Sequence, residues 1–461
     1  MASSLKRGML YVFIANVINL FFNLITNFIL PKELSVESYA MIKTFQLYVS
    51  YAGLFHIGFV DGMYIKYGGK SVNEINKLDL KKNLYTLRTF QIVVTVVLCL
   101  LSILSGDMVL ICFSISILPL NLANYFKQLY QATGEFSLYG KIMNASTMLI
   151  FVANMLGIFV LKEDNGNYYL VSNLVVYVGI WLVLEVNCHK IVGRNIKTKF
   201  FSLKEFLENV KAGILLTIGN LSSILLTSMD RWFVKVFLNT FAFAQNSFAV
   251  SMENFMNTAI TPVTVTLYNY FCKTTNINQI RKVRNYVMIF ASVIVACAFP
   301  ARFILEIYLN KYINSLQVMF LLFASQIFYI IIKSIFVNLY KAQRKQKVYF
   351  VKLVMVIIIA FIFNIICYKV VQVKESFAVG TLLSAICWYF LCLPDFKKIK
   401  YTFKEMIYPF IQMVAFLVCG FTFNAIVGLA IYIMFTVATT FILLKKEVID
   451  IWMVLDKRMK K

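Results

Sequence analysis

The feature that most constrains this chain of 461 residues is its series of long apolar segments. Each is close to the ~20 residues that an α-helix needs to cross the ~30 Å hydrocarbon core of a bilayer. Because the chain is 60% hydrophobic and only 14% charged, its solvent is expected to be mostly lipid. We therefore predict an all-α polytopic membrane protein with fourteen transmembrane helices, at approximately 8–30, 41–60, 84–105, 108–127, 140–161, 168–188, 210–229, 240–271, 285–305, 314–338, 349–368, 376–394, 406–425 and 427–444.

The basic residues are distributed unevenly between the two ends of these spans. About 35 of the 45 Lys and Arg residues lie at the N-terminus, at the even-numbered connections or at the C-terminus. Under the positive-inside rule, this asymmetry predicts that both termini are cytoplasmic. The net charge of +24 is spread over short juxtamembrane clusters such as Lys81-Lys82, which topology and anionic headgroups explain without a nucleic-acid partner.

Several function classes are excluded by what the sequence lacks. The nine cysteines lie in or beside apolar spans without CxxC spacing, so we predict neither a metal site nor a cofactor. No GxxxxGKS or GxxxxGKT motif is present, which argues against ATP hydrolysis. The longest connections, at about 62–83 and 189–209, have only about twenty residues and cannot hold a catalytic domain. A transporter is therefore predicted, and not an enzyme.

The two halves of the chain share a short sequence repeat. LYQA at 129–132 closes the fourth span and LYKA at 339–342 closes the tenth, and Tyr139 and Tyr349 follow at the same spacing of 210 residues. Spans that are six apart run in the same direction, so the repeats are parallel, as in many carriers. We predict an N-lobe at 1–200 with spans one to six, a C-lobe at 201–404 with spans seven to twelve, and an additional helix pair with a basic tail at 405–461.

Further short motifs resemble one transporter family. They are GMLY at 8–11 before an Asn-rich helix that ends at Pro31, Ser38-Tyr39 after it, DGMYIKYGG at 61–69, LYQATG at 129–134 and DRWFV at 230–234. In this order and at these positions, the chain resembles the bacterial polysaccharide and O-antigen flippases, the Wzx-like family of the multidrug/oligosaccharidyl-lipid/polysaccharide (MOP) exporter superfamily. The sequence departs from the family pattern at Tyr39-Ala40 and at the second copy of QATG, which reads KAQR.

The resemblance implies a specific activity and location. It implies a multi-pass protein of the bacterial inner membrane that moves an undecaprenyl-diphosphate-linked oligosaccharide to the outer leaflet, for O-antigen, capsule or exopolysaccharide synthesis. Its implied partners are this lipid-linked oligosaccharide, membrane lipids, a polysaccharide polymerase and a chain-length regulator. A diphosphate and its sugars cannot cross hydrocarbon unaided, so alternating access would need a hydrated cavity that offers cations and hydrogen bonds.

Several cations lie in or near predicted spans and could face such a cavity. The best candidate is Lys333, because it lies about two helical turns from the interface inside span ten. Lys43, Arg231 and Arg302 lie near outer ends and could instead snorkel to the headgroups. The remaining candidates, at or near span ends, are Lys66, Arg88, Lys127 and Lys235.

Polar and acidic groups complete the predicted site. A stripe on one face of span one could line the cavity or form a helix-packing seam, and Gln46 lies on span two; the stripe consists of Asn16, Asn19, Asn23 and Asn27. For coupling to an ion gradient, Glu253 is either a titrating group or the ion-pair partner of Lys333. The other intramembrane candidates for coupling or ion pairing are Asp61, Asp230 and His56.

Three rivals to the flippase are distinguishable by their chemistry. A non-transporting scaffold would not need the buried Lys and Glu. A cation-coupled multidrug exporter of the same superfamily would favour an acidic or aromatic cavity, whereas this chain has more candidate cations than acids. A membrane-embedded polysaccharide polymerase or transferase would need a catalytic constellation on a loop, which the short connections do not provide.

Overall fold

The computed structural model describes residues 2–192, 198–274, 276–397, 399, 401–450 and 453, and within these ranges it leaves undescribed the side chains of 2–16, 189–192, 258, 259, 261, 262, 265 and 269. The described chain is all helical. Eleven of its helical segments are long and apolar enough to cross a membrane. The predicted all-α, multi-pass class is thus confirmed, while the total of fourteen spans and the cytoplasmic termini remain predictions.

The chain divides into two compact units, Met1–Leu225 and Leu226–Lys461. The boundary falls inside one long helix, α8. The helices of the first unit are α1 (Ala2–Glu33), α2 (Val36–Val49), α3 (Phe59–Tyr67), α4 (Lys77–Ser105), α5 (Met108–Ala132), α6 (Phe136–Met155), α7 (Gly166–Val192) and most of α8 (Leu203–Phe237). Those of the second are α9 (Thr240–Lys273), α10 (Ile277–Ile294), α11 (Ala298–Tyr308), α12 (Leu316–Ile331), α13 (Asn338–Ala342), α14 (Gln346–Val370), α15 (Lys374–Cys392), α16 (Phe403–Thr422) and α17 (Ala425–Leu443). The predicted division into lobes at 1–200 and 201–404 remains a prediction.

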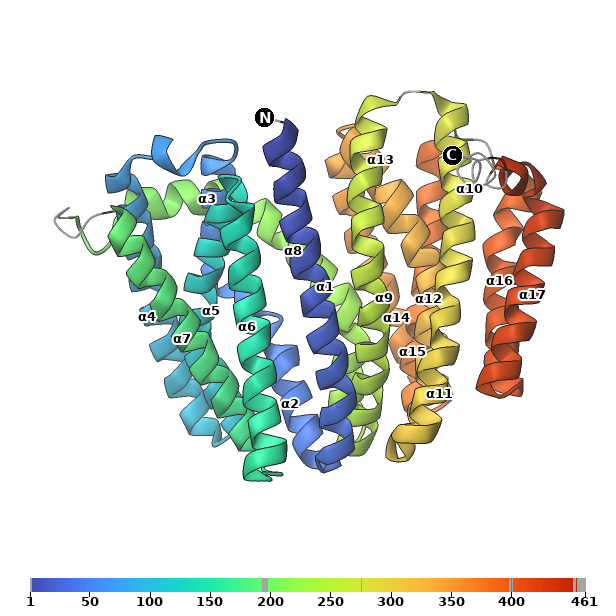
Figure 1. Ribbon diagram of the computed structural model, residues 1–461, viewed down its shortest axis with the longest axis horizontal. Coiled ribbons are helices and arrows are strands. Elements are labelled where there is room, and N and C mark those ends of the chain that lie inside the picture. The colour runs from blue at the N-terminus through green and yellow to red at the C-terminus, as the bar shows by residue number, and fades with distance from the viewer. Residues whose placement is uncertain are drawn as a thin grey trace. The chain divides into compact units, whose positions relative to one another are not determined.

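Each unit is built around one central helix. In the first unit, α5 packs against α2, α3, α4, α6 and α7, and 61% of its most apolar stretch is buried. In the second unit, the central segment is Asn310–Ala342, which contains α12 and α13. Of its most apolar stretch, 89% is buried, and the segment packs against α9, α10, α15 and α16. Around these cores, α1 packs along α6, and α16 lies beside α17 as a hairpin (Figure 1).

The repeated LYQA and LYKA sequences form the same turn at the ends of α5 and α13. The amide of Glu135 donates to the carbonyl of Tyr130 at 2.8 Å, and the amide of Lys345 donates to the carbonyl of Tyr340, also at 2.8 Å. The residue before each of these amides is left-handed, with φ of 78° at Gly134 and 57° at Arg344. The two segments that the sequence pairs at a spacing of 210 residues therefore have the same backbone geometry.

The predicted second span is interrupted in the structure. The chain passes from α2 through a 3₁₀ turn, η1 (Ala52–His56), into α3, and the break contains two left-handed residues, Ile57 at φ 50° and Gly58 at φ 86°. Carbonyls released from helical bonding need other partners in lipid. Asn121 donates to the carbonyl of Ala52 at 3.1 Å, and Gln91 donates to that of Phe55 at 2.9 Å. Two amides from neighbouring helices thus stabilise the break.

Glycines allow α3 to approach α8 very closely. A Cβ atom on Gly213 of α8 would lie 2.1 Å from the carbonyl oxygen of Gly58 and 2.2 Å from the backbone nitrogen of Gly62. Only glycine fits such a backbone-to-backbone contact, as at other small-residue crossings of membrane helices. The crossing brings Thr217 within hydrogen-bonding reach of Asp61, and its hydroxyl donates to the Asp61 carboxylate.

Candidate functional site

The second unit contains a group of polar and charged side chains inside an otherwise apolar helix bundle. Four elements contribute to this group, which we call the polar centre: the end of α8, helix α9, helix α12 and a π-helical segment, η6 (Ile332–Val337). Such groups are expensive to bury in a membrane protein and usually mark a substrate or ion pathway. Its members are Asp230, Arg231, Gln245, Asn246, Ser247, Glu253, Gln326, Tyr329 and Lys333.

Glu253 is the acidic member of the polar centre that connects α9 with α12. The Gln326 amide donates a hydrogen bond to the Glu253 carboxylate. The charges of Asp230, Lys333 and Arg231 all act on Glu253. The structure therefore brings together four of the residues that the sequence singled out, two acids and two cations.

Lys333 lies in the π-helical segment η6, directly after α12. Its ammonium nitrogen is 5.5 Å from the centroid of the Tyr329 ring. Among the described residues, no carboxylate comes within the 4.0 Å of an ion pair with it, so Glu253 acts on Lys333 only at longer range. A π-helical turn inside an α-helix often occurs at a functional site because it redirects a side chain, and a cation over an aromatic face is stabilised without being neutralised. The Lys333 ammonium thus has an aromatic neighbour but no direct carboxylate partner among the described residues.

Asp230 is the second acidic residue of the polar centre. Asn246 donates to its carboxylate at 3.3 Å, and both side chains are buried, at 4% and 0% exposure. Around them, several buried polar atoms have no hydrogen-bond partner among the described residues: Arg231 Nε, Gln245 Nε2, Asn246 Oδ1, Ser247 Oγ and Gln326 Oε1. Buried polar atoms in native proteins are nearly always satisfied, so this group indicates a place where water or a polar ligand binds.

In the first unit, the structure joins three other predicted residues. The Lys43 ammonium on α2 donates to Asn27 Oδ1 on α1 at 2.7 Å and to Gln46 Oε1 at 3.2 Å, and it lies 5.3 Å from the Tyr39 ring centroid. Lys43 is buried, at 7% exposure. The contact links α1 to α2, and the choice between cavity lining and helix packing for Asn27 remains a prediction.

The rest of the Asn stripe has mixed surroundings. Asn19 is buried, and its Oδ1 has no hydrogen-bond partner among the described residues. Asn23 is exposed, and its carbonyl accepts a 2.8 Å bond from the Asn27 amide. Asn16 belongs to α1, but its side chain lies outside the described set. A cavity-lining role for the stripe remains a prediction.

His56 and Asp61 lie at the break in the second predicted span. The amide of Gly58 donates to Nδ1 of His56 at 3.2 Å, so the imidazole supports the backbone where the helix is interrupted. Asp61 accepts from Thr217, as described above, and both His56 and Asp61 are almost fully buried. These contacts stabilise the break and the α3–α8 crossing, and a coupling role for His56 and Asp61 remains a prediction.

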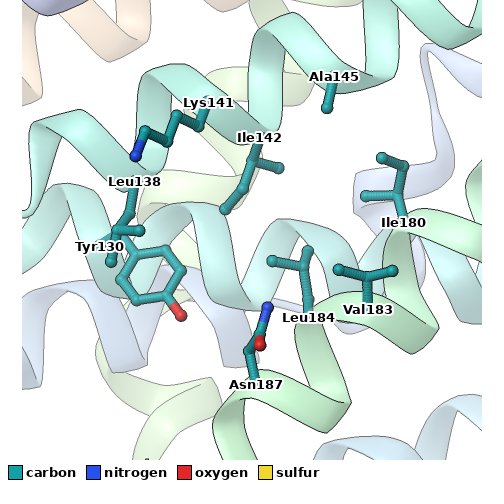
Figure 2. A pocket seen from close by; sticks show the side chains of 9 residues that line it. All are labelled: Tyr130, Leu138, Lys141, Ile142, Ala145, Ile180, Val183, Leu184 and Asn187. Atoms are coloured by element: carbon teal, nitrogen blue, oxygen red, sulfur yellow. The ribbon is translucent and has the colours of Figure 1, made fainter.

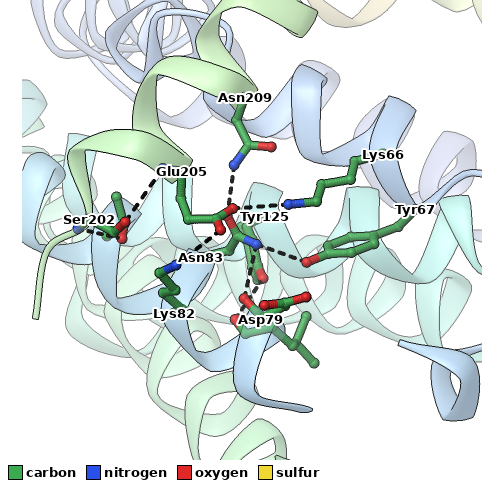
Figure 3. Close-up of polar contacts among 11 residues, drawn as sticks. Lys66, Tyr67, Asp79, Lys82, Asn83, Tyr125, Ser202, Glu205 and Asn209 are labelled. Carbon is green, nitrogen blue, oxygen red and sulfur yellow. Dashed lines mark hydrogen bonds and ion pairs between the residues drawn. The ribbon is translucent and has the colours of Figure 1, made fainter. Parts of the chain in front are cut away.

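Lys66 and Arg302 bind groups at helix ends. Lys66 contacts Glu205 in the first turn of α8 at 2.9 Å, and Lys82 contacts the same carboxylate at 3.2 Å (Figure 3). We call this cluster the first anchor. Arg302 pairs with Glu306 at 2.6 Å and donates to the carbonyls of Gly420 and Phe423 at the end of α16, at 2.7 and 2.6 Å. Neither cation belongs to the polar centre, and a substrate-binding role for them remains a prediction.

A buried amide chain supports the first anchor. Asn209 on α8 donates to Asn83 on α4 at 2.7 Å, and Asn83 donates to the Tyr67 hydroxyl at 2.8 Å (Figure 3). Both asparagines are essentially unexposed. Because unpaired amides are costly in lipid, this chain fixes the position of α8 against α3 and α4.

A matching cluster, which we call the second anchor, was missed from the sequence. Glu405, in the first turn of α16, binds Arg281 at 2.9 Å and the unexposed Arg284 at 2.9 Å. The Arg284 guanidinium also stacks 3.8 Å from the centroid of the Tyr401 ring, and burial raises the pKa of this phenol to about 12, which keeps it neutral. The sequence does contain a pattern that could have indicated this cluster. Ser-x-Lys-Glu at 202–205 and Thr-x-Lys-Glu at 402–405 stand at the starts of α8 and α16, so the same helix-start motif occurs at both anchors.

Comparison with known proteins identifies the fold. Neither a protein-family profile nor a curated protein sequence matches this chain. Among solved structures, the lipid II flippase MurJ in an inward closed conformation is similar over 96% of this chain and 100% of its own, with a TM-score of 0.66 and 14% identity. A multidrug resistance MATE family transporter of the MOP superfamily, in an outward-facing conformation, is similar over 87% of this chain and 96% of its own, with a TM-score of 0.51 and 14% identity. The chain therefore has the fold of MOP-superfamily transporters.

Proposed function

We propose that the protein is a flippase that moves undecaprenyl-diphosphate-linked oligosaccharide repeat units from the cytoplasmic to the outer leaflet of the bacterial inner membrane. The observation that carries this proposal is the likeness to the lipid II flippase MurJ over essentially the full length of both chains. The Wzx-like sequence motifs favour a surface polysaccharide precursor as the substrate. The lobes 1–200 and 201–404 would alternate in opening the path to each side.

The polar centre supplies the chemistry that such a substrate needs. A diphosphate requires cations and hydrogen-bond donors once it leaves water. Within the part of the chain that the structure describes, Lys333 has no carboxylate at ion-pair distance, and the donors Arg231 Nε and Gln245 Nε2 have no hydrogen-bond partner. In this proposal, Glu253 balances the charge of Lys333 when the substrate is absent and weakens its hold on the diphosphate, so that release remains fast.

A multidrug exporter is the second candidate, because the polar centre also contains two acids. Asp230 and Glu253 balance Arg231 and Lys333, and carboxylates in an aromatic setting would suit a cationic drug. The two functions differ in the sign of the substrate charge. Removing Lys333 would abolish anion transport, whereas removing Glu253 would abolish export of a cation.

The proposal is tested in a strain whose chromosomal copy of the gene is deleted. We expect lipid-linked repeat units to accumulate on the cytoplasmic leaflet and surface polysaccharide to disappear. The intact protein should restore the polysaccharide, as should Lys347→Ala, which removes an exposed lysine of α14. Lys333→Ala should not.

Three results would contradict the proposal in different ways. Normal surface polysaccharide in the deletion strain would exclude a surface polysaccharide precursor as the substrate. Accumulation of lipid II instead would retain the flippase class and change its cargo. Unchanged lipid intermediates combined with new drug sensitivity would favour the exporter.

A further inference from the structure

A cleft in the first unit lies between the ends of α5, α6 and α7 (Figure 2). Its volume is about 530 Å³. The polar groups of Tyr130, Lys141 and Asn187 gather toward one end of it, and Ala145, Ile180 and Val183 lie toward the other. This cleft belongs to neither the polar centre nor the two anchors.

The Tyr130 hydroxyl is the most informative group in the cleft. The side chain is only 5% exposed, and it lines the cleft. Figure 2 shows the hydroxyl directed into the cleft, on the side of Asn187. A phenol hydroxyl that faces a cleft can donate a hydrogen bond to a polar group of a ligand bound there.

The charge of the cleft is positive. Lys141 forms no ion pair with a described residue and is the only charged side chain among those that line the cleft. Glu185, next to the lining residue Leu184, is paired with Arg88 at 2.6 Å. Glu135 is the acid whose charge reaches Tyr130, and it does not line the cleft. An anionic group is therefore the complement of Lys141.

The polarity of the cleft changes along the helix axes. Helix α6 begins at Phe136, so Lys141 lies near the start of the helix. Ala145 lies four residues further along, which is about 6 Å deeper in the bilayer at 1.5 Å per residue. Helix α7 ends at Val192, so Asn187 lies near the end of the helix. Ile180 lies about 10 Å deeper in the bilayer than Asn187. A polar mouth at the interface and an apolar floor toward the middle of the bilayer match a phospholipid, with its headgroup above its acyl chains.

We propose that this cleft binds one anionic glycerophospholipid, at the helix ends that the distribution of basic residues assigns to the cytoplasmic leaflet. Lys141 pairs with the phosphodiester, the Tyr130 hydroxyl donates to a phosphate or ester oxygen, and an acyl chain lies along Ile142 and Leu184. This inference is independent of the transported substrate, since it concerns a resident membrane lipid.

The test is native mass spectrometry of the purified full-length protein after equilibration with phosphatidylglycerol or with phosphatidylcholine. We expect selective retention of one phosphatidylglycerol, about tenfold weaker in Lys141→Ala, which loses a charge-assisted bond, and about threefold weaker in Tyr130→Phe, which loses one hydroxyl. Lys141→Arg should retain the lipid. Lys70→Ala is the matched control, because it removes an exposed lysine from the connection between α3 and α4.

Two results would overturn the proposal. Equal retention of phosphatidylglycerol by the wild type and Lys141→Ala would show that the cleft does not select the anion. Displacement of the signal by millimolar inorganic phosphate would show that the site takes free phosphate and not a lipid. Persistence of the bound lipid in phosphate, together with its loss in Lys141→Ala, would support the proposal.

Discussion

The contact between α3 and α8 gives a sharp stability prediction. Gly213→Ala places a methyl group 2.1 Å from the Gly58 carbonyl oxygen and 2.2 Å from the Gly62 nitrogen, and both atoms belong to backbone. Backbone cannot rotate away as a side chain can. To reach an ordinary contact of 3.4 Å, the two helices must therefore separate by about 1.3 Å.

The separation has a cost that can be worked out from the neighbouring bonds. Overpacking of this kind costs about 1–3 kcal/mol. A movement of this size also takes the Thr217 hydroxyl out of reach of the buried Asp61 carboxylate, and a bond to a charged group contributes about 1.5–3 kcal/mol. We expect the free energy of unfolding to fall by about 3–6 kcal/mol, which for a unit of this size lowers Tm by on the order of 10 °C.

Thermal unfolding of the detergent-purified protein, followed by intrinsic fluorescence, measures this effect. Gly219→Ala is the matched control on the same helix, because no atom lies within 4 Å of the Cβ that it adds. The control should be as stable as the wild type or up to about 1 kcal/mol more stable, since alanine favours the helix. Equal Tm values for Gly213→Ala and Gly219→Ala would refute the close crossing.

Three further predictions concern stability and use the same unfolding assay. Glu405→Ala leaves the unexposed Arg284 without its carboxylate and should cost about 3–5 kcal/mol, whereas its exposed neighbour Lys404→Ala should change little; equal effects would argue against the second anchor. Asn121→Ala should cost about 1–3 kcal/mol by leaving a carbonyl of the broken span unpaired, and no loss would mean that water replaces the amide. Arg344→Gly should stabilise by about 1 kcal/mol because its φ of 57° favours glycine, and destabilisation would contradict the left-handed turn.

The sequence predicted the features that depend on composition and repetition. Hydropathy is enough to identify an all-α membrane protein because lipid requires each spanning segment to satisfy its own backbone bonds. The sequence paired LYQA with LYKA as a repeat, and both segments end in turns with equivalent bonds and a left-handed residue, while the lobes inferred from the repeat remain a prediction. The ion pair between Glu253 and Lys333 that the sequence offered remains a prediction, because no carboxylate lies within ion-pair distance of the Lys333 ammonium among the described residues.

Other features depend on contacts between helices that are distant in sequence. The break at Ile57 and Gly58 looks like part of an ordinary apolar span, since its stability comes from Gln91 and Asn121 on other helices. Gln326 likewise joins Glu253 across 73 residues. Arg302 donates to two helix-end carbonyls of α16, which lies more than 100 residues away in the sequence, and its role as a cavity cation or a snorkelling residue remains a prediction. Hydropathy predicts how deep in the membrane a residue lies, but it does not predict which residues of other helices it contacts.

The most direct test of the central claim is a leaflet-translocation assay in proteoliposomes. The purified protein would be reconstituted with a fluorescent undecaprenyl-diphosphate oligosaccharide, and a membrane-impermeant quencher would report which leaflet holds the label. We predict that the wild type and Lys347→Ala move the lipid between leaflets and that Lys333→Ala slows the movement at least about tenfold, as expected for losing a buried cation that binds phosphate. Movement by Lys333→Ala at the wild-type rate, or none by the wild type above protein-free vesicles, would contradict the claim.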